Sequence, residues 1–229
     1  MGRWVTLKSA DGFEFPAWEA QCFGTARMAV VVVQEIFGVN AHIRSVADRF
    51  AARGYHAVAP AMFSRVRDGV DLGYEAGDMA EGVALKAKIE HLPAPGVLPD
   101  LQAAIDHAAR ISQRKVGITG FCWGGLLTWR AACELTGLSA AAAYYGGGMT
   151  APAEVARQPR VPVMAHFGRK DQHIPLAGVE QFASAHPEVQ VHLYDAGHGF
   201  HCDARASYDE TAAALARERT LAFFDRHLA

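Results

Sequence analysis

The stretch that most constrains the fold runs from Lys115 to Thr128 and reads KVGITGFCWGGLLT. It predicts a buried strand, a tight turn and a helix, with Gly120 and Gly124 placed two residues either side of Cys122. This spacing matches the nucleophile-elbow pattern G-x-S-x-G, with cysteine in the serine position. The turn strains the backbone of the central residue, and flanking glycines avoid collisions with neighbouring backbone. The sulfur would lie at a helix N-terminus, where a thiolate or an oxyanion is stabilised. The alternative is a glycine-rich turn with a buried structural cysteine, because G-x-C-x-G also arises by chance.

Strands and helices alternate along the rest of the chain. The continuous apolar run Met28–Val33 is typical of a parallel strand that is buried on both faces. Asp11-Gly12 between two short alternating runs predicts a β-hairpin at the start. Further strands are expected at 55–60, 138–144, 161–167 and 189–194, and helices after Asn40 and at about 78–91, 98–111, 123–134, 175–186 and 205–228. This alternation predicts one doubly wound α/β domain over residues 1–229, with the long segment 61–77 as a lid.

The composition excludes several classes of protein. The 229 residues include 22 basic and 24 acidic side chains, a balance that favours neither nucleic acid nor an anionic membrane as a partner. No apolar segment approaches the roughly 18 residues of a membrane span, and the first residues do not resemble a secretory signal. We therefore expect a cytoplasmic protein with four free thiols, no cofactor and no metal, acting on a small molecule as a monomer or small homo-oligomer.

Three chemically competent residues follow three of the expected strands. Hydrolysis by a nucleophile needs an attacking group, a base and an acid that orients the base. In α/β-hydrolases these occur in the order nucleophile, acid, histidine. Here Cys122, Asp171 and His198 occur in that order, each in a loop after a strand. Because the carboxyl ends of parallel strands share one edge of a sheet, we expect the three side chains to meet there.

Other residues compete for these roles less well. His173 is too close to Asp171 in the chain to serve from a separate loop, and His201 lacks the glycines that flank His198. Asp195 lies in the same loop as His198 and is better explained as a turn residue. A metal site built from His198, His201, Cys202 and Asp203 would match no established zinc spacing.

Several motifs together resemble the dienelactone hydrolase (carboxymethylenebutenolidase) family. They are Gln34-Glu-Ile-Phe-Gly38, Gly120-Phe-Cys-Trp-Gly-Gly125, Tyr144-Tyr-Gly146, Gly168-x-x-Asp171 and Gly197-His-x-Phe200, and the resemblance covers essentially the whole length. It implies a compact α/β-hydrolase fold with little or no cap. It also implies hydrolysis of unsaturated lactones through a cysteinyl ester, with Cys122 as nucleophile, His198 as base and Asp171 as orienting acid.

The resemblance gives Glu35 a further role, in which its carboxylate engages the thiol until substrate binds and then helps to take its proton. A solvated loop carboxylate is the alternative. The oxyanion should be held by the backbone N–H groups of Trp123 and Ile36, the first after the nucleophile and the second in the loop after the first long strand. Aromatic residues are expected to form the pocket walls, although they could equally be plain core: Phe37, Trp123, Tyr144, Tyr145 and Phe200.

The sequence departs from the family pattern at the arginines that hold the substrate carboxylate. One belongs in a His-x-Phe-x-Arg arrangement, where this chain has Cys202, and the next arginine is Arg205. The other belongs in the long segment after the second core strand, where Arg65 and Arg67 lie nearby. A bidentate arginine is not readily replaced, so a broader ester or thioester substrate is plausible. A redox-sensing thiol without hydrolase activity is the alternative from another class.

Overall fold

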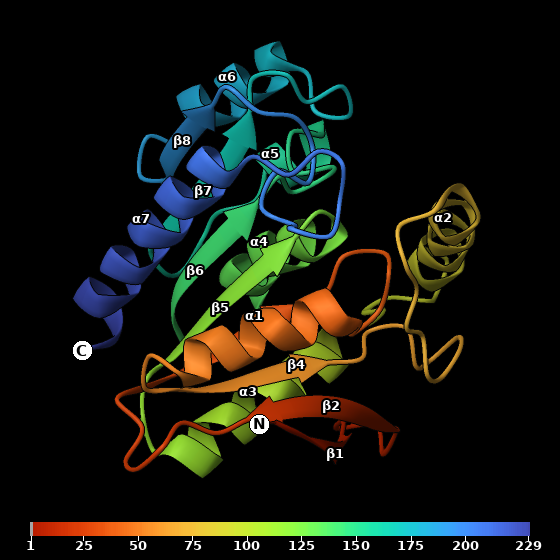
Figure 1. Ribbon diagram of the computed structural model, residues 1–229, viewed down its shortest axis with the longest axis vertical. Helices are drawn as coiled ribbons and strands as arrows, with labels where there is room; N and C mark the ends of the chain where they lie inside the picture. Colours follow the sequence, from red (N-terminus) through yellow and green to blue (C-terminus); the bar gives the residue numbers. More distant parts are fainter. Residues whose placement is uncertain (1) are drawn as a thin grey trace.

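The computed structural model describes residues 2–229 as one eight-stranded sheet with helices on both faces (Figure 1). The strands are β1 (Arg3–Lys8), β2 (Glu14–Ala20), β3 (Met28–Val33), β4 (Tyr55–Pro60), β5 (Val116–Phe121), β6 (Leu138–Tyr144), β7 (Val163–Gly168) and β8 (Gln190–Tyr194). The helices are α1 (Ala41–Ala51), α2 (Ala76–Glu90), α3 (Leu98–Ser112), α4 (Trp123–Glu134), α5 (Pro152–Val155), α6 (Leu176–Ala185) and α7 (Glu210–Leu228).

The sheet has the order β1-β2-β4-β3-β5-β6-β7-β8. The β1–β2 and β2–β4 pairs are antiparallel and the other pairs are parallel. Every residue of the central strands β3 and β5 is buried, as their apolar sequences predict for strands covered on both faces. The predicted α/β class, with a mostly parallel sheet and a leading antiparallel hairpin, is confirmed.

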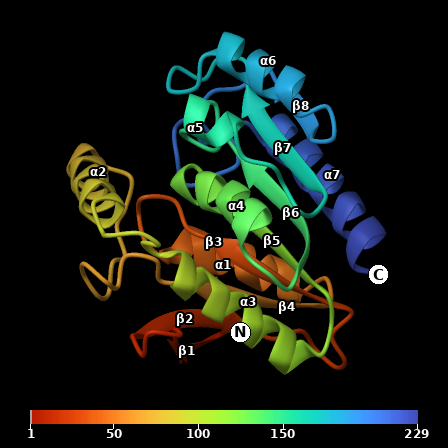
Figure 2. The same cartoon turned by 180° about the vertical axis from the view of Figure 1, so that it is seen from behind.

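Two pairs of helices cover the sheet. Helices α1 and α7 pack on one face, and α3 and α4 pack on the other, which Figure 2 shows from behind. Asn40 caps α1, as predicted, by accepting a hydrogen bond from the Ile43 N–H at 3.2 Å. Because the strand ends and helix starts lie along one edge of the sheet, the loops at this edge can bring distant residues together.

The C-terminal helix is shorter than predicted. It begins at Glu210 rather than at residue 205, and Asp209 caps it by accepting from the Ala212 N–H at 2.8 Å. The residues before Asp209 continue the loop that carries His198. This loop turns Arg205 back toward the carboxyl edge of the sheet, where it contacts Glu35. Helical periodicity alone does not predict this contact.

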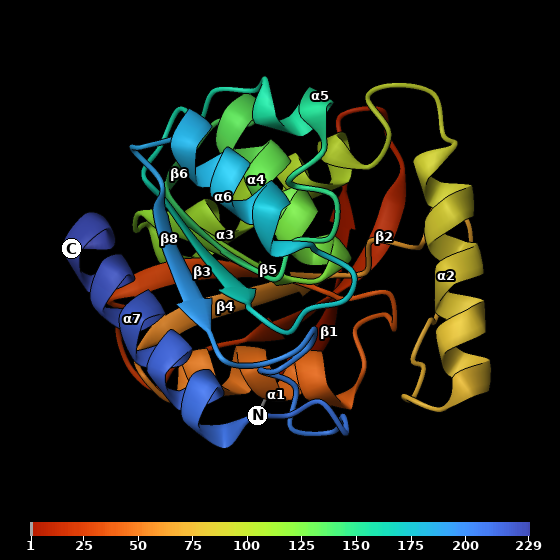
Figure 3. The ribbon, with the colours of Figure 1, turned by 90° about the horizontal axis from the view of Figure 1, so that it is seen from above.

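The long segment after β4 is tied to the loop after β3. Asn40 donates to the Leu72 carbonyl and to the Tyr74 hydroxyl, both at 3.0 Å. The Leu72 N–H donates to the Phe37 carbonyl at 2.9 Å, and Gly38 pairs with Asp71 as an isolated bridge. The segment leads into α2, which stands at the side of the molecule in Figure 3. These hydrogen bonds indicate that the segment after β4 is ordered and held against the loop after β3.

All four cysteines are free thiols, and Cys122 alone among them is partly exposed. Within residues 2–229, no helix has the length and apolar character that a membrane crossing would need.

Candidate active site

The turn between β5 and α4 holds Cys122 in a strained conformation, with φ 54° and ψ −116°. The surrounding glycines are required by close backbone contacts. A Cβ at Gly120 would lie 2.2 Å from the Gly124 carbonyl oxygen, and one at Gly124 would lie 2.4 Å from the Gln34 carbonyl oxygen. A Cβ at Gly125 would lie 2.6 Å from the Tyr144 carbonyl oxygen. Helix α4 therefore begins in close contact with the ends of β3 and β6. The Cys122 side chain projects from the turn.

Asp171 and His198 meet across two neighbouring loops, after β7 and after β8. The His198 Nδ1–H donates to Asp171 Oδ2 at 2.7 Å. The other oxygen, Oδ1, accepts from the backbone N–H groups of His173 at 2.8 Å and Ile174 at 3.1 Å. Burial would raise the pKa of Asp171, but the hydrogen bonds from His198 and from these two amides lower it. The carboxylate is therefore ionised and fixed, and it sets the tautomer of the imidazole.

The His198 ring also interacts with Cys122. Burial by itself would lower the pKa of His198, but hydrogen bonds and charge interactions with Asp171 and Cys122 raise it to about 10. The side chain is 10% exposed, and the Tyr145 ring packs edge-on against it at 5.1 Å between centroids. The structure thus places the sulfur, the imidazole and the carboxylate, which lie far apart in the chain, at one edge of the sheet.

Two backbone N–H groups beside Cys122 remain available to an external acceptor. Within the described chain, no hydrogen bond uses the N–H of Trp123, at the start of α4, or that of Ile36, in the loop after β3. Helix α2 packs closely on this loop, because a Cβ at Gly82 would lie 2.5 Å from the Ile36 carbonyl oxygen. These are the two amides that the sequence assigned to the oxyanion.

Glu35 is buried and pairs with Arg205. It is 1% exposed, and its Oε1 accepts from Arg205 Nη1 at 3.1 Å, while Oε2 is buried without a partner in residues 2–229. Burial raises the pKa of Tyr145, and the charges of Glu35, Cys202 and Cys122 raise it further. These groups therefore share one cluster, so Glu35 is not a solvated loop carboxylate.

The predicted pocket aromatics lie in different places. Tyr145 and Phe200 are fully buried and pack edge-on at 5.3 Å, beside His198. Phe37 lies under the Arg205 guanidinium, 5.6 Å from ring centroid to Cζ. Tyr144 is a correction: its hydroxyl bonds to Thr220 on α7 at 2.7 Å, so its side chain lies in the core beneath that helix. Tyr144 ends β6, and the chain turns at Tyr145, whose φ is 36°.

Arg65 is a second correction. Its guanidinium donates to both carboxylate oxygens of Asp100, at 2.7 and 2.6 Å, and pairs with Asp11 at 2.8 Å. It also lies 4.5 Å from the Phe13 ring centroid. These partners belong to α3 and to the β1–β2 turn, so Arg65 holds the hairpin to the body of the protein and does not serve the site. Arg205, in contrast, is 14% exposed and contacts the cluster around Cys122.

Tyr74 is a site residue that the sequence did not single out. Burial raises its pKa, as do the neighbouring Glu35 carboxylate and the Cys202 thiol, while the Asn40 amide donates to its hydroxyl. It forms a T-shaped contact with Phe37 at 4.6 Å. An aromatic residue in the unusually long segment after β4 was the available signal, but no motif identifies it.

One group of side chains has ligand atoms close enough to be compared with a metal site. The ligand atoms of His42, Cys202 and Asp203 lie within 4.8 Å of one another, and Cys202 and Asp203 belonged to the metal set considered from the sequence. His42 Nδ1 is 2.8 Å from Asp203 Oδ1, and Arg49 pairs with the other oxygen at 3.3 Å. Burial raises the pKa of the Cys202 thiol to about 12. A protonated thiol and a carboxylate that already bonds to His42 and Arg49 are poor starting ligands for a metal.

The fold and the site geometry together define an α/β-hydrolase. Comparison with known proteins agrees: the model of the dienelactone hydrolase family matches residues 18–228. The carboxymethylenebutenolidase of Pseudomonas putida is 31% identical over 238 residues, which cover 96% of this chain and 94% of that one. A Synechocystis protein with the provisional name carboxymethylenebutenolidase is 36% identical over 215 residues, 87% of this chain and 86% of its own.

A solved structure agrees with these sequences. A provisionally named dienelactone hydrolase from Klebsiella pneumoniae superposes with a TM-score of 0.80 at 32% identity, covering 97% of this chain and 99% of its own. The chain therefore belongs to the dienelactone hydrolase family. The predicted family and the predicted class of enzyme, a hydrolase of the dienelactone hydrolase type, are confirmed.

Proposed function

We propose that this chain hydrolyses a small lactone or carboxylic ester through a thioester formed on Cys122. The observation that carries the proposal is the His198–Asp171 hydrogen bond beside Cys122, which lies at a strained turn, together with the unused N–H groups of Trp123 and Ile36. A structural cysteine needs neither a histidine of raised pKa nor a buried carboxylate behind that histidine. A nucleophile needs both.

The steps follow from the positions of these groups. His198, oriented by Asp171, holds the proton of the Cys122 thiol, and the thiolate attacks the substrate carbonyl carbon. The carbonyl oxygen becomes an oxyanion and accepts hydrogen bonds from Trp123 and Ile36 N–H. As the tetrahedral intermediate collapses, the C–O bond breaks and His198 returns its proton to the leaving oxygen. His198 then takes a proton from water, and the resulting hydroxide cleaves the thioester and regenerates the thiol.

Glu35 and Arg205 are the groups that couple substrate binding to this chemistry. In the free protein they neutralise each other, since Arg205 Nη1 bonds to Glu35 Oε1. A substrate carboxylate that bonds to Arg205 would release Glu35, whose second oxygen already has no partner in the described residues. The released carboxylate can then accept the thiol proton and pass it to His198, so that the thiolate and the imidazolium form when the substrate binds.

The available cation limits the substrate. Arg205 faces the cluster around Cys122, whereas Arg65 is occupied by Asp11 and Asp100. One arginine, shared with Glu35, favours substrates with at most one carboxylate, and it leaves neutral esters acceptable. A general carboxylesterase or thioesterase activity on the same groups is therefore the second candidate function.

The test compares hydrolysis of p-nitrophenyl acetate and of a dienelactone by the parent and by Cys122→Ala. Cys133→Ala is the matched control, because Cys133 is a buried thiol on the same helix, α4. We expect Cys122→Ala to lose turnover of both substrates, by about 10⁴-fold or more, and Cys133→Ala to retain it. A stopped-flow burst of p-nitrophenol with the parent would identify the thioester, and equal turnover by Cys122→Ala would dispose of the proposal.

A further inference from the structure

The ring of His198 touches a residue that has no place in the steps proposed above. Its Nδ1–H bonds to Asp171, and the Tyr145 ring packs against it with 5.1 Å between centroids and 61° between the ring planes. The ring of His173 makes a second contact of the same kind, T-shaped, at 5.1 Å and 77°. The imidazole at the centre of the site is therefore held against two aromatic rings, of which Tyr145 is buried and His173 is exposed.

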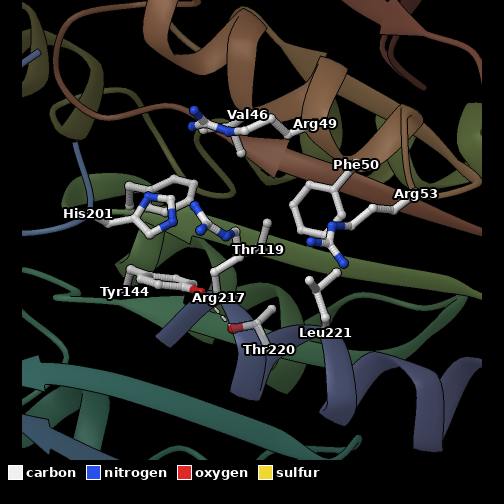
Figure 4. Close-up of a pocket in the computed structure, with 11 residues that line it drawn as sticks. Val46, Arg49, Phe50, Arg53, Thr119, Tyr144, His201, Arg217, Thr220 and Leu221 are labelled. Atoms are coloured by element: carbon white, nitrogen blue, oxygen red, sulfur yellow. Dashed lines mark hydrogen bonds between the residues drawn. The ribbon is translucent and has the colours of Figure 1, made fainter. Parts of the chain in front are cut away.

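The loop that carries His198 is anchored three residues further on, at His201. The buried His201 ring stacks on Phe121 with 5.0 Å between centroids, and Figure 4 shows it beside Tyr144, whose ring is also 5.0 Å away. This anchor fixes the backbone of the loop. The orientation of the His198 ring depends instead on the residues that touch the ring itself.

The hydrogen bond to Asp171 does not by itself fix the orientation of that ring. The χ2 torsion of a histidine is broad, so small rotations of the imidazole can keep the Nδ1–H bond to Asp171. The same rotations move Nε2 relative to the Cys122 sulfur. Displacements of this size lower the rate of a proton transfer, which needs its two heavy atoms at hydrogen-bonding distance. Rings packed against the imidazole resist the rotation.

The ring of His173 is placed by the same loop that places the orienting acid. The His173 backbone N–H donates to Asp171 Oδ1 at 2.8 Å, so the ring starts from a fixed point beside the carboxylate. Within residues 2–229, the ring makes one aromatic contact, with His198, and no side-chain hydrogen bond. The spacing of two residues, which excludes His173 as the base, is therefore suited to a residue that positions the base.

We propose that His173 is a positioning residue, whose ring keeps the imidazole of His198 directed at the Cys122 sulfur. Its effect on turnover rests on the proposed function, but its effect on the sulfur does not. The imidazole is the group that takes the thiol proton, so its position sets the fraction of Cys122 that is thiolate in the free protein as well. KM should change little, because His173 supplies none of the groups assigned to the substrate carbonyl.

The experiment measures the rate at which iodoacetamide alkylates Cys122, together with steady-state hydrolysis of p-nitrophenyl acetate. Alkylation needs the thiolate but no substrate, and the other three cysteines are buried. Cys122→Ala gives the background. His173→Ala should lower the alkylation rate and kcat about fivefold each, the scale of one aromatic contact, and leave KM within about twofold.

Three further variants make the result specific. His173→Phe keeps a ring at this position and should restore both rates to within about twofold of the parent. His173→Gln keeps a polar side chain without a ring and should behave as His173→Ala does. Gln172→Ala, an exposed neighbour in the same loop, should change neither rate. Thermal unfolding of each variant separates a displaced imidazole from a misfolded chain.

The two rates distinguish failure of this inference from failure of the proposed function. Parental alkylation in His173→Ala and His173→Gln, or a His173→Phe variant as slow as these two, overturns the positioning role. A fall in kcat without a fall in alkylation also overturns it, because His173 would then act on the substrate. If the parent hydrolyses no ester but its alkylation still depends on the His173 ring, the positioning role stands and the proposed function fails.

Discussion

His198 and His201 lie three residues apart on one loop, and both are largely buried, yet their pKa values are raised to about 10 and lowered to about 3. Burial lowers the pKa of both rings, because it disfavours the charged imidazolium. The difference comes from the partners. His198 bonds to an ionised carboxylate and lies beside a thiol, whereas His201 packs against Phe121 at 5.0 Å and faces Arg49 and Arg217.

The comparison teaches that the site depends on Asp171 more than on the burial of the histidine. The imidazole that has the carboxylate can hold a proton at neutral pH. The imidazole that faces aromatic rings and arginines, and that Asp203 influences only weakly, stays neutral and lies in the core. Substitutions that remove a partner should therefore have much larger effects on His198 than on its neighbour.

The largest effect is expected from replacing the two histidines themselves. His198→Ala should lower kcat by about 10⁵-fold, because the proton of the thiol and of the leaving group then has no carrier. His201→Phe should leave kcat within about threefold, since a phenyl ring preserves the packing on Phe121. Steady-state hydrolysis of p-nitrophenyl acetate measures both. Comparable losses in the two variants would remove the distinction between the rings.

The second effect concerns the carboxylates that face these rings. Asp171→Asn should lower kcat by about 10³-fold or more, because an amide no longer fixes the tautomer or stabilises the imidazolium. The same change should lower the pKa of His198, which histidine NMR shifts would report. Asp203→Asn is the matched control, because Asp203 acts on His42 and His201, and kcat should stay near the parental value. A parental kcat in Asp171→Asn would show that another group orients His198.

A third effect tests the loop after β3, where the position of the Ile36 backbone amide matters. Gly82→Val should press α2 away from the Ile36 carbonyl, which a Cβ would approach to 2.5 Å, and so displace the Ile36 N–H. We expect kcat to fall by about tenfold, in line with the sensitivity of catalysis to small displacements. Gly77→Ala is the control on the same helix, because a Cβ there meets nothing within 4 Å. Unchanged turnover in Gly82→Val would argue against Ile36 as an oxyanion donor.

The sequence was sufficient for the parts of this site that short-range pattern determines. The glycines around Cys122, the strand exits at Asp171 and His198, and the Asn40 cap all depend on local geometry, and local geometry is encoded in spacing. The directions in which long side chains point were less predictable from the sequence. Arg65 follows β4 in the expected segment, but its guanidinium turns to Asp100 and Asp11, partners that only the tertiary fold brings near.

Tyr144 and Tyr145 show the same limit at shorter range. The motif contains both residues, but the positive φ of Tyr145 sends one ring beneath α7 and the other to His198. Backbone reversal at a non-glycine residue has no clear sequence signal. The sequence likewise predicts residues 205–209 as helix because their composition resembles that of α7, although they form part of the loop that returns Arg205 to Glu35.

The smallest effect is on stability, where the two histidines should act with opposite signs. The His201 pKa is lower in the folded protein than its ordinary value of 6.5, so the unfolded chain binds more protons between pH 6.5 and about 3. The contribution of His201 to the free energy of unfolding is fully present above pH 6.5 and is lost as the pH falls from 6.5 toward 3. The His198 pKa is raised to about 10, so its contribution is present below pH 6.5 and is lost as the pH rises toward 10.

Urea unfolding at a series of pH values can separate the two contributions. Each histidine should change the free energy of unfolding by at most about 1.4 kcal/mol per pH unit within its own window. His201→Phe should flatten the acidic limb and leave the alkaline limb intact, whereas Asp171→Asn should flatten the alkaline limb, because His198 then loses the partner that raises its pKa. If both variants flattened the same limb, the two rings would not differ in the way that their partners require.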